Sequence, residues 1–229
     1  MEIDKKLFFI AFLITITLFF VILVVTSVMN NERQGIIDER TDLLLSEYKD
    51  METINLLSEI YGEEFFCIGL KKKLEELDKY LWDTGSKIEN YQDASSTFVK
   101  DQSYVKQKKT FNQNEIYYLA LFKNFQKKCN WSNKVIFYFY RNSKDCPDCD
   151  AQSFVLTDIK QSLDQDVAIF SFDMDLGLSS LESLNDYYKI KEYPCVIVDE
   201  KAYCGLRDKK EILEILCQGF NIDYCENYQ

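Results

Sequence analysis

Two cysteines, Cys146 and Cys149, stand two residues apart in the run Asp145-Cys146-Pro147-Asp148-Cys149-Asp150. Thiols at this spacing lie about one turn apart once a helix begins at the first of them. Such a pair can close a disulfide, or one thiol can attack a substrate disulfide while the other resolves the mixed intermediate. The residue types therefore predict thiol–disulfide exchange, with Cys146 as the nucleophile and Cys149 as the resolving thiol.

The flanking residues predict a strand before the motif and a helix after it. Val135–Tyr140 is β-branched and aromatic, which is typical of a buried strand, and Ala151–Leu163 carries apolar residues at helical spacing. The motif would then open a helix, where unpaired N–H groups and the helix dipole stabilise a thiolate. Pro147 would occupy the first helical position, where a helix tolerates proline best.

Three aspartates crowd the thiols and oppose the helix dipole, because nearby negative charge disfavours a thiolate. One carboxylate a few ångströms away contributes up to ~4 kcal/mol at an effective dielectric of ~20, before salt screening. The dipole contributes ~0.3–2 kcal/mol. We therefore expect the pKa of Cys146 to lie near or above that of a free thiol, and a role as reductase or isomerase rather than strong oxidant.

A second motif, Tyr193-Pro194, contains one of only two prolines in the chain. Around it, patterns predict a strand at Val167–Asp173, a helix at Ser179–Tyr188, a hairpin from Cys195 to Gly205 and a last helix at Asp208–Leu216.

With the Cys-Pro-x-Cys motif, this order resembles the thioredoxin-like superfamily of thiol–disulfide oxidoreductases over residues 134–218. The resemblance implies an α/β thioredoxin-like fold with a mixed central sheet flanked by helices. It also implies a cis Pro194 facing the motif, with Tyr193 and Pro194 holding the substrate backbone. No cofactor is implied beyond the redox-active Cys146–Cys149 disulfide.

One departure from the family leaves a second hypothesis open. Tyr140 stands where thioredoxins carry a buried acid on the strand before the motif, so the usual proton acceptor for the resolving thiol is missing. The alternative is a non-enzymatic interaction module in which Cys146–Cys149 is an inert structural disulfide.

Composition narrows the remaining function classes. The net charge of −11 argues against nucleic-acid binding, which needs a basic surface. The chain has no histidine, which excludes histidine-based catalytic triads and histidine-containing metal sites. No second CxxC motif completes a four-ligand zinc site, so we expect no metal.

The chain has eight cysteines, an even and high count that suggests disulfides in an oxidising compartment. Cys217 and Cys225 are close enough in sequence to clip the tail to the last helix. Cys67 and Cys129 are the two cysteines of the predicted helical region and could pin it together. Cys195 could be a buried small hydrophobe or a third thiol near the active pair, and we favour the first.

Leu7–Met29 is an uncharged, mainly apolar run that reaches about 35 Å as a helix, enough to cross a hydrocarbon core of about 30 Å. No small-residue cleavage site follows, which favours an uncleaved signal anchor. Lys5 and Lys6 flank its N-terminal side, so we expect that end in the cytoplasm and the cysteine-rich C-terminal part outside. The expected partners are protein thiols and disulfides, the membrane, and an unidentified membrane redox protein.

These patterns divide the chain into a transmembrane anchor (1–29), a mainly helical stalk or cap (30–130) and a thioredoxin-like domain (131–229). In the middle part we expect helices over 36–61 and 63–82, the second ending near Gly85. We expect a loop or weak helix over 93–110. The capping-box spacing of Asn112 and Glu115 predicts a helix that begins there and runs to Cys129.

Overall fold

The computed structural model describes residues 5–94, 102–131, 134–163, 166–218 and 225. In chain order the elements are α1 (Lys5–Tyr61), α2 (Glu63–Ala94), α3 (Gln102–Cys129), β1 (Lys134–Tyr140), α4 (Cys149–Leu163), β2 (Val167–Asp173), η3 (Met174–Leu176), α5 (Ser179–Tyr188), β3 (Cys195–Val198), β4 (Lys201–Cys204) and α6 (Lys209–Cys217). Two compact units, Met1–Leu43 and Leu44–Gln229, make up the chain.

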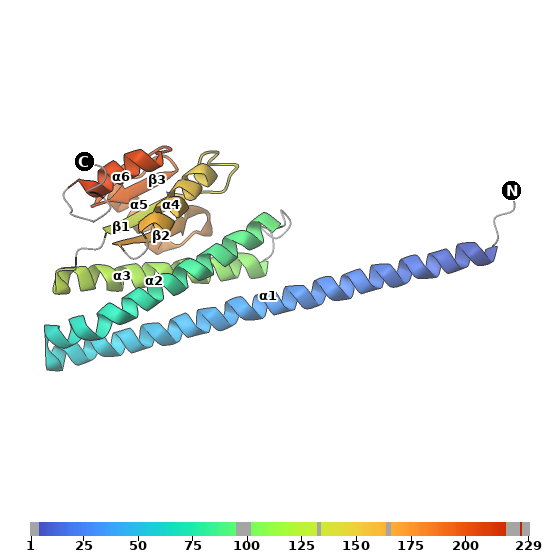
Figure 1. Cartoon of the computed structure of the whole chain (residues 1–229), viewed down its shortest axis with the longest axis horizontal. Helices are drawn as coiled ribbons and strands as arrows, with labels where there is room; N and C mark the ends of the chain where they lie inside the picture. The colour runs from blue at the N-terminus through green and yellow to red at the C-terminus, as the bar shows by residue number, and fades with distance from the viewer. Residues whose placement is uncertain (1–4, 95–101, 132–133, 164–165, 219–224, 226–229) are drawn as a thin grey trace. The chain divides into compact units, whose positions relative to one another are not determined.

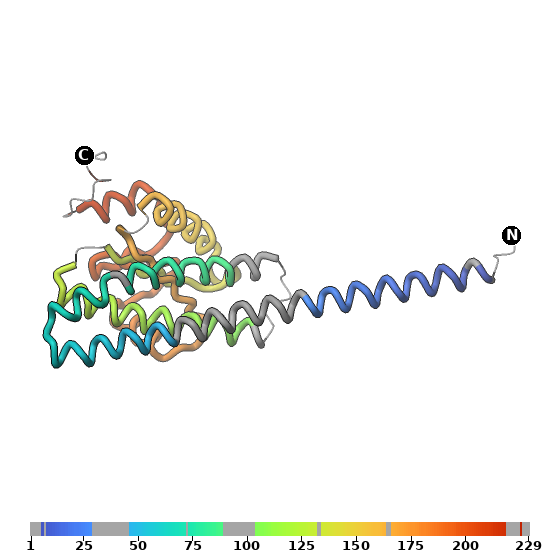
Figure 2. Tube along the Cα trace, turned by 60° about the horizontal axis from the view of Figure 1, so that its bottom comes forward, coloured from blue at the N-terminus to red at the C-terminus, as the bar shows by residue number. Residues whose placement is uncertain are grey.

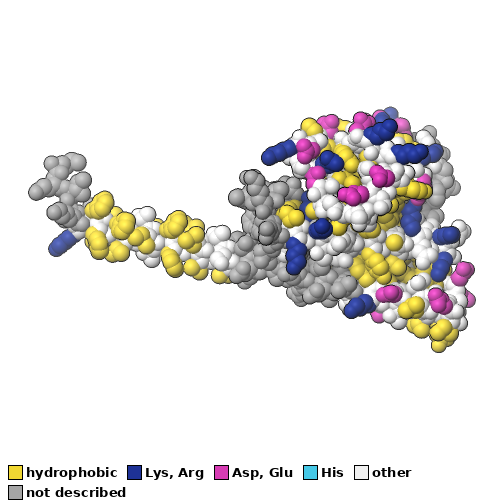
Figure 3. Space-filling model, turned by 180° about the vertical axis from the view of Figure 1, so that it is seen from behind, with side chains coloured by type: hydrophobic (Ala, Val, Ile, Leu, Met, Phe, Trp, Pro, Cys, Tyr) yellow, Lys and Arg dark blue, Asp and Glu magenta, His cyan; other side chains and the backbone are white. Residues whose placement is uncertain are grey.

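The first unit contains a stretch of α1, Phe8–Val28, that is long and apolar enough to cross a membrane. Its side chains are exposed, and Figure 3 shows hydrophobic side chains along it. The hydroxyls of Thr15, Thr17 and Thr26 each donate to a backbone carbonyl four residues earlier. These polar groups are therefore satisfied within the helix, as a lipid environment requires. The separate runs expected at 7–29 and 36–61 form one continuous helix.

The second unit contains a mixed sheet, whose described strands run in the order β2-β1-β3-β4. β1 and β2 are parallel, whereas β3 is antiparallel to both β1 and β4. The predicted strand Val167–Asp173 and helix Ser179–Tyr188 are confirmed at both ends, as β2 and α5. The expected mixed sheet with flanking helices is therefore present.

Side chains alternate between the two faces of the sheet. On one face, Ile136 and Tyr138 of β1 and Val196 and Val198 of β3 form a buried core with α4 and α6. On the other face, the rings of Phe137 and Phe139 pack against those of β2 and α5.

The helices α2 and α3 lie side by side (Figures 1 and 2) and are joined by the Cys67–Cys129 disulfide. α3 covers the outer edge of β2, where the ring of Tyr118 packs on Phe170. At that edge the Ser171 N–H donates to Glu115 Oε1 (3.2 Å) and the Asp173 N–H donates to Asn112 Oδ1 (2.9 Å). Side-chain oxygens of α3 thus accept hydrogen bonds from backbone N–H groups that would otherwise be unpaired at an open sheet edge.

Two helix boundaries expected in this region are wrong. Asn112 and Glu115 do contact each other, but they lie in the interior of α3, which begins at Gln102. Gly85 does not end α2, which continues to Ala94. A Cβ at Gly85 would lie 3.1 Å from Phe111 Cζ, so this glycine allows α2 and α3 to approach closely. Of the segment 93–110, expected as a loop or weak helix, residues 93–94 belong to α2 and 102–110 to α3, whereas 95–101 lie outside the described residues.

Candidate active site

Cys146 and Cys149 form a disulfide between the end of β1 and the start of α4. Each is only 1% exposed, so burial does not separate a nucleophile from a resolving thiol. The neighbours Asp145, Pro147, Asp148 and Asp150 are exposed. Solvent and salt therefore screen the three carboxylates beside the disulfide.

The helix begins later than expected, because α4 starts at Cys149 and not at Cys146. The Gln152 N–H donates to Asp148 O (3.0 Å), so Asp148 precedes the first helical residue and Pro147 lies outside the helix. Asp148 thus takes the position before the helix, where aspartate is among the preferred residues. Cys146 instead lies in a turn, where its N–H donates to Asn142 O (2.9 Å).

Asn142 organises the loop that leads into the motif. Its side-chain Nδ2 donates to Asp145 Oδ2 (2.9 Å) and to Asp175 Oδ2 (2.6 Å), and its Oδ1 accepts from the Lys144 N–H (3.1 Å). The last contact is an Asx turn, a local signal present in the sequence that was not among the predicted features. Asp175 follows β2, so the motif loop is held by two segments that are distant in sequence.

The Tyr193–Pro194 peptide bond is cis, the state that the resemblance implies. Arg141, just after β1, lies over the Tyr193 ring at 5.0 Å and pairs with Asp175 at 3.9 Å. The Tyr193 hydroxyl donates to Asn185 Oδ1 (2.7 Å). Arg141 and Asp175 therefore connect Tyr193 to the loop that carries Cys146.

Pro194 is connected to α4 through the segment that follows β4. The Gly205 N–H donates to Pro194 O (2.8 Å), and two residues later the Arg207 N–H donates to Gln152 Oε1 (2.8 Å). Gln152 lies on the first turn of α4 and is completely buried. The structure thus connects both sequence motifs within one network, in which Gln152 and Arg207 were not predicted.

Tyr138 contacts the motif helix directly, because its hydroxyl donates to Cys149 O (2.6 Å). Its ring stacks on Tyr140 with centroids 5.2 Å apart. Lys108 Nζ lies 5.2 Å from the other ring, Tyr140, and forms a 2.5 Å ion pair with Asp173. A buried ion pair therefore lies beside Tyr140, the last residue of β1.

The other six cysteines form three disulfides. Cys67 pairs with Cys129 and Cys217 pairs with Cys225, the two pairings considered from sequence above. Cys195 pairs with Cys204, so it is neither a free buried hydrophobe nor a third thiol. The reason is strand register, because the β3–β4 pairing places Cys195 directly opposite Cys204.

Within the described ranges, no three histidine, cysteine, aspartate or glutamate residues cluster in a way that could hold a metal ion.

No protein-family model matches this chain, and no curated protein does. Among solved structures, one match is a chain titled "Structure of a malarial protein", with 15% identity and a TM-score of 0.33. The alignment covers 38% of this chain and 96% of that chain. A score this low assigns neither fold nor function.

Proposed function

We propose that this protein is a membrane-tethered thiol–disulfide oxidoreductase acting on protein thiols and disulfides outside the cytoplasm. The observation that carries the proposal is the Cys146–Cys149 disulfide between the end of β1 and the start of α4. The strand order β2-β1-β3-β4 and the cis peptide bond before Pro194 also support it, because both agree with the interpretation of residues 134–218 as thioredoxin-like.

In the proposed reaction the reduced protein acts on a substrate disulfide. The Cys146 thiolate attacks one substrate sulfur, a mixed disulfide forms, and the other substrate sulfur leaves as a thiolate that takes up a proton. Cys149 then loses its proton and attacks Cys146 Sγ, which releases the second substrate thiol. Two electrons pass to the substrate, and a partner dithiol must reduce the Cys146–Cys149 disulfide before the next cycle.

The non-enzymatic alternative rests on the missing acid at Tyr140 and on the three aspartates beside the motif, and the structure adds the burial of Cys146 and Cys149 to 1% exposure. A disulfide that solvent does not reach is slow to exchange with external thiols. The two hypotheses therefore differ in how fast Cys146 reacts once the disulfide is reduced.

Insulin reduction by the full-length protein in detergent tests the proposal. We expect Cys146→Ser to abolish turnover, and Cys149→Ser to retain one attack that traps a mixed disulfide. Removal of the Cys217–Cys225 disulfide by paired alanine substitutions serves as a control and should leave turnover in place. Equal residual turnover in the two active-site variants, or alkylation of Cys146 no faster than that of Cys149 after reduction, would favour the structural-disulfide alternative.

The tether follows from Phe8–Val28, because a helix of this length and hydropathy can span a bilayer. The proposed orientation, with the N-terminus in the cytoplasm, comes from Lys5 and Lys6 and agrees with a disulfide-rich exterior part. Protease added outside intact cells or spheroplasts should degrade the chain beyond about residue 30. Protection of the whole C-terminal part would reverse the orientation.

A further inference from the structure

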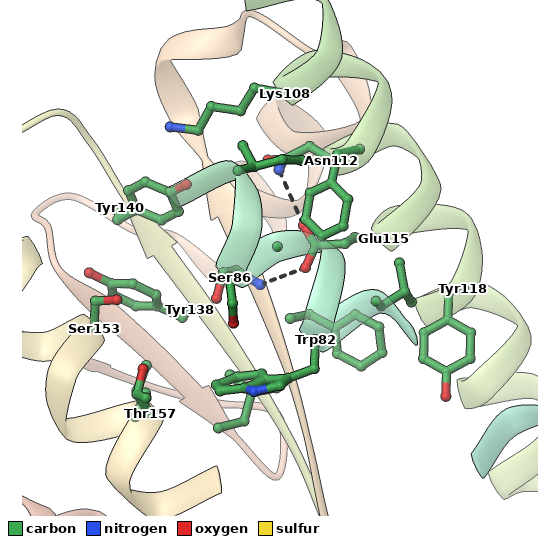
Figure 4. A pocket seen from close by; sticks show the side chains of 18 of the residues that line it. Trp82, Ser86, Lys108, Asn112, Glu115, Tyr118, Tyr138, Tyr140, Ser153 and Thr157 are labelled. Atoms are coloured by element: carbon green, nitrogen blue, oxygen red, sulfur yellow. Dashed lines mark hydrogen bonds between the residues drawn. The ribbon is translucent and has the colours of Figure 1, made fainter. Parts of the chain in front are cut away.

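A pocket opens between α2 and α4 and extends to α3, β1 and β2; we refer to it as the α2–α4 pocket (Figure 4). Trp82 and Ser86 line it from α2, Tyr138 from β1, and Ser153 and Thr157 from α4. Figure 4 shows the Trp82 indole on one side, with Thr157 and Tyr138 on the other. Helices outside the thioredoxin-like region therefore form half of a site on the motif helix.

The walls and the mouth of this pocket differ in chemistry. The inner wall contains buried groups, among them Tyr138, Phe170 and the Glu115 carboxylate. Ser86 of α2 and Ser153 and Thr157 of α4 are half-buried lining residues that carry hydroxyls, and we refer to them as the mouth of the pocket. A ligand that fits would place an apolar ring inside and a hydrogen-bonding group near the mouth.

The size of the pocket limits the ligand to one ring. The cavity measures about 60 Å³, and a single water molecule needs roughly 10–15 Å³ by the same measure. The space therefore suits a few waters or one six-membered ring, and not a nucleotide or a fused-ring cofactor.

Charge excludes another group of ligands. Lys108 is a lining residue, but its ammonium is paired with Asp173 at 2.5 Å, while Glu115 adds negative charge to the wall. A negatively charged ligand, such as a carboxylate or phosphate, would be repelled by the Glu115 carboxylate in a partly desolvated site, so its binding is unfavourable. A neutral or cationic ring is favoured.

The position of the pocket relates it to the disulfide. Ser153 is one helical turn after Cys149 on α4, a separation of about 6 Å along the helix axis. Tyr138, which forms part of the wall, donates its hydroxyl proton to Cys149 O at 2.6 Å. The pocket therefore lies about one helical turn from the Cys149 end of the disulfide.

We propose that the α2–α4 pocket binds a single aromatic ring that carries a hydrogen-bonding substituent, packed against Trp82 and Tyr138. Two sources share this chemistry: a tyrosine side chain of the substrate polypeptide, and a free phenol. The first source rests on the oxidoreductase function proposed above, whereas the binding site itself does not.

Fluorescence of Trp82 tests the site without reference to catalysis. The chain has two tryptophans, so Trp131→Phe leaves Trp82 as the reporter in the full-length protein. Titration with p-cresol should change its emission saturably, and cyclohexanol should bind about two- to tenfold more weakly because it lacks the aromatic interaction. Ser153→Phe and Thr157→Phe each place a ring in the mouth and should abolish the response. No saturable change, or the same change in a blocked variant that is folded by circular dichroism, would overturn the proposal.

Kinetics with two peptides identify the source of the ring. The peptides contain the same disulfide and differ in a tyrosine or an alanine beside the attacked cysteine. Preference for the tyrosine peptide, as a ratio of kcat/KM, should fall about two- to tenfold in Trp82→Ala. An unchanged ratio together with p-cresol binding would assign the pocket to a free ligand. If neither peptide is reduced, the oxidoreductase proposal fails, and the fluorescence titration still decides the pocket.

Discussion

The buried ion pair between Lys108 and Asp173 provides the sharpest test of how α3 is held to the sheet. Its atoms are 2.5 Å apart and the two side chains are 10% and 9% exposed. Lys108→Met removes the ammonium and leaves the Asp173 carboxylate buried, where the Asp175 N–H still donates to it at 2.9 Å. Loss of one partner from a buried pair typically costs about 3–5 kcal/mol, and the remaining hydrogen bond places our expectation at about 3 kcal/mol.

Urea unfolding of the full-length protein in detergent, followed by tryptophan fluorescence, measures this cost. With a slope of about 1–3 kcal/mol per molar urea, a loss of 3 kcal/mol lowers the midpoint by about 1–3 M. The double variant Lys108→Met/Asp173→Asn should recover much of the loss, because no charge is then buried alone. Lys106→Met, an exposed lysine on the same helix, should change stability by less than about 0.5 kcal/mol. The reasoning fails if Lys108→Met costs no more than Lys106→Met, or if the double variant is as unstable as the sum of the single ones.

Three further outcomes are expected. Replacing Cys67 and Cys129 by alanine removes a disulfide between residues 62 apart in sequence. The chain-entropy model predicts that the free energy of unfolding falls by about 4 kcal/mol, against about 2–3 kcal/mol for removal of the shorter Cys217–Cys225 disulfide. The Cys67/Cys129 variant should therefore have the lower urea midpoint, and the reverse order would contradict the model. Burial acts to raise the pKa of Glu200, but hydrogen bonds from Lys123 and Tyr188 outweigh it and the pKa is lowered. The Glu200 carboxylate therefore stabilises the fold above its unfolded-state pKa of about 4.3, and this stabilisation is lost as pH falls through its folded-state pKa. Glu200→Gln should lower the urea midpoint at pH 7 and make the midpoint fall less steeply on acidification. A variant whose midpoint depends on pH as in the original protein would refute this. Finally, equilibration with glutathione buffers should place the Cys146–Cys149 potential well below the value of about −120 mV typical of a strong oxidant, and a value near it would show the electrostatic expectation for the three aspartates to be wrong.

The sequence alone was sufficient for elements whose signals are local. β2 and α5 begin and end where the patterns predict, because alternation and helical spacing are properties of neighbouring residues. The strand before the CxxC motif and the helix after it were found for the same reason. The exception is the start of α4, which begins at Cys149 with Asp148 before it and not at the first cysteine.

Tertiary structure decided which partner each polar or reactive group meets. The spacing of Asn112 and Glu115 is that of a helix cap, but these side chains serve backbone N–H groups of β2, more than fifty residues away in sequence. Strand register, not spacing, pairs Cys195 with Cys204. Lys108 lies in a polar stretch with no sign of burial, yet packing of α3 on the sheet edge places it against Asp173. Local sequence encodes the preference of the backbone for helix or strand. The partner of a side chain, by contrast, comes from a distant part of the sequence, and packing of the whole unit determines which part that is.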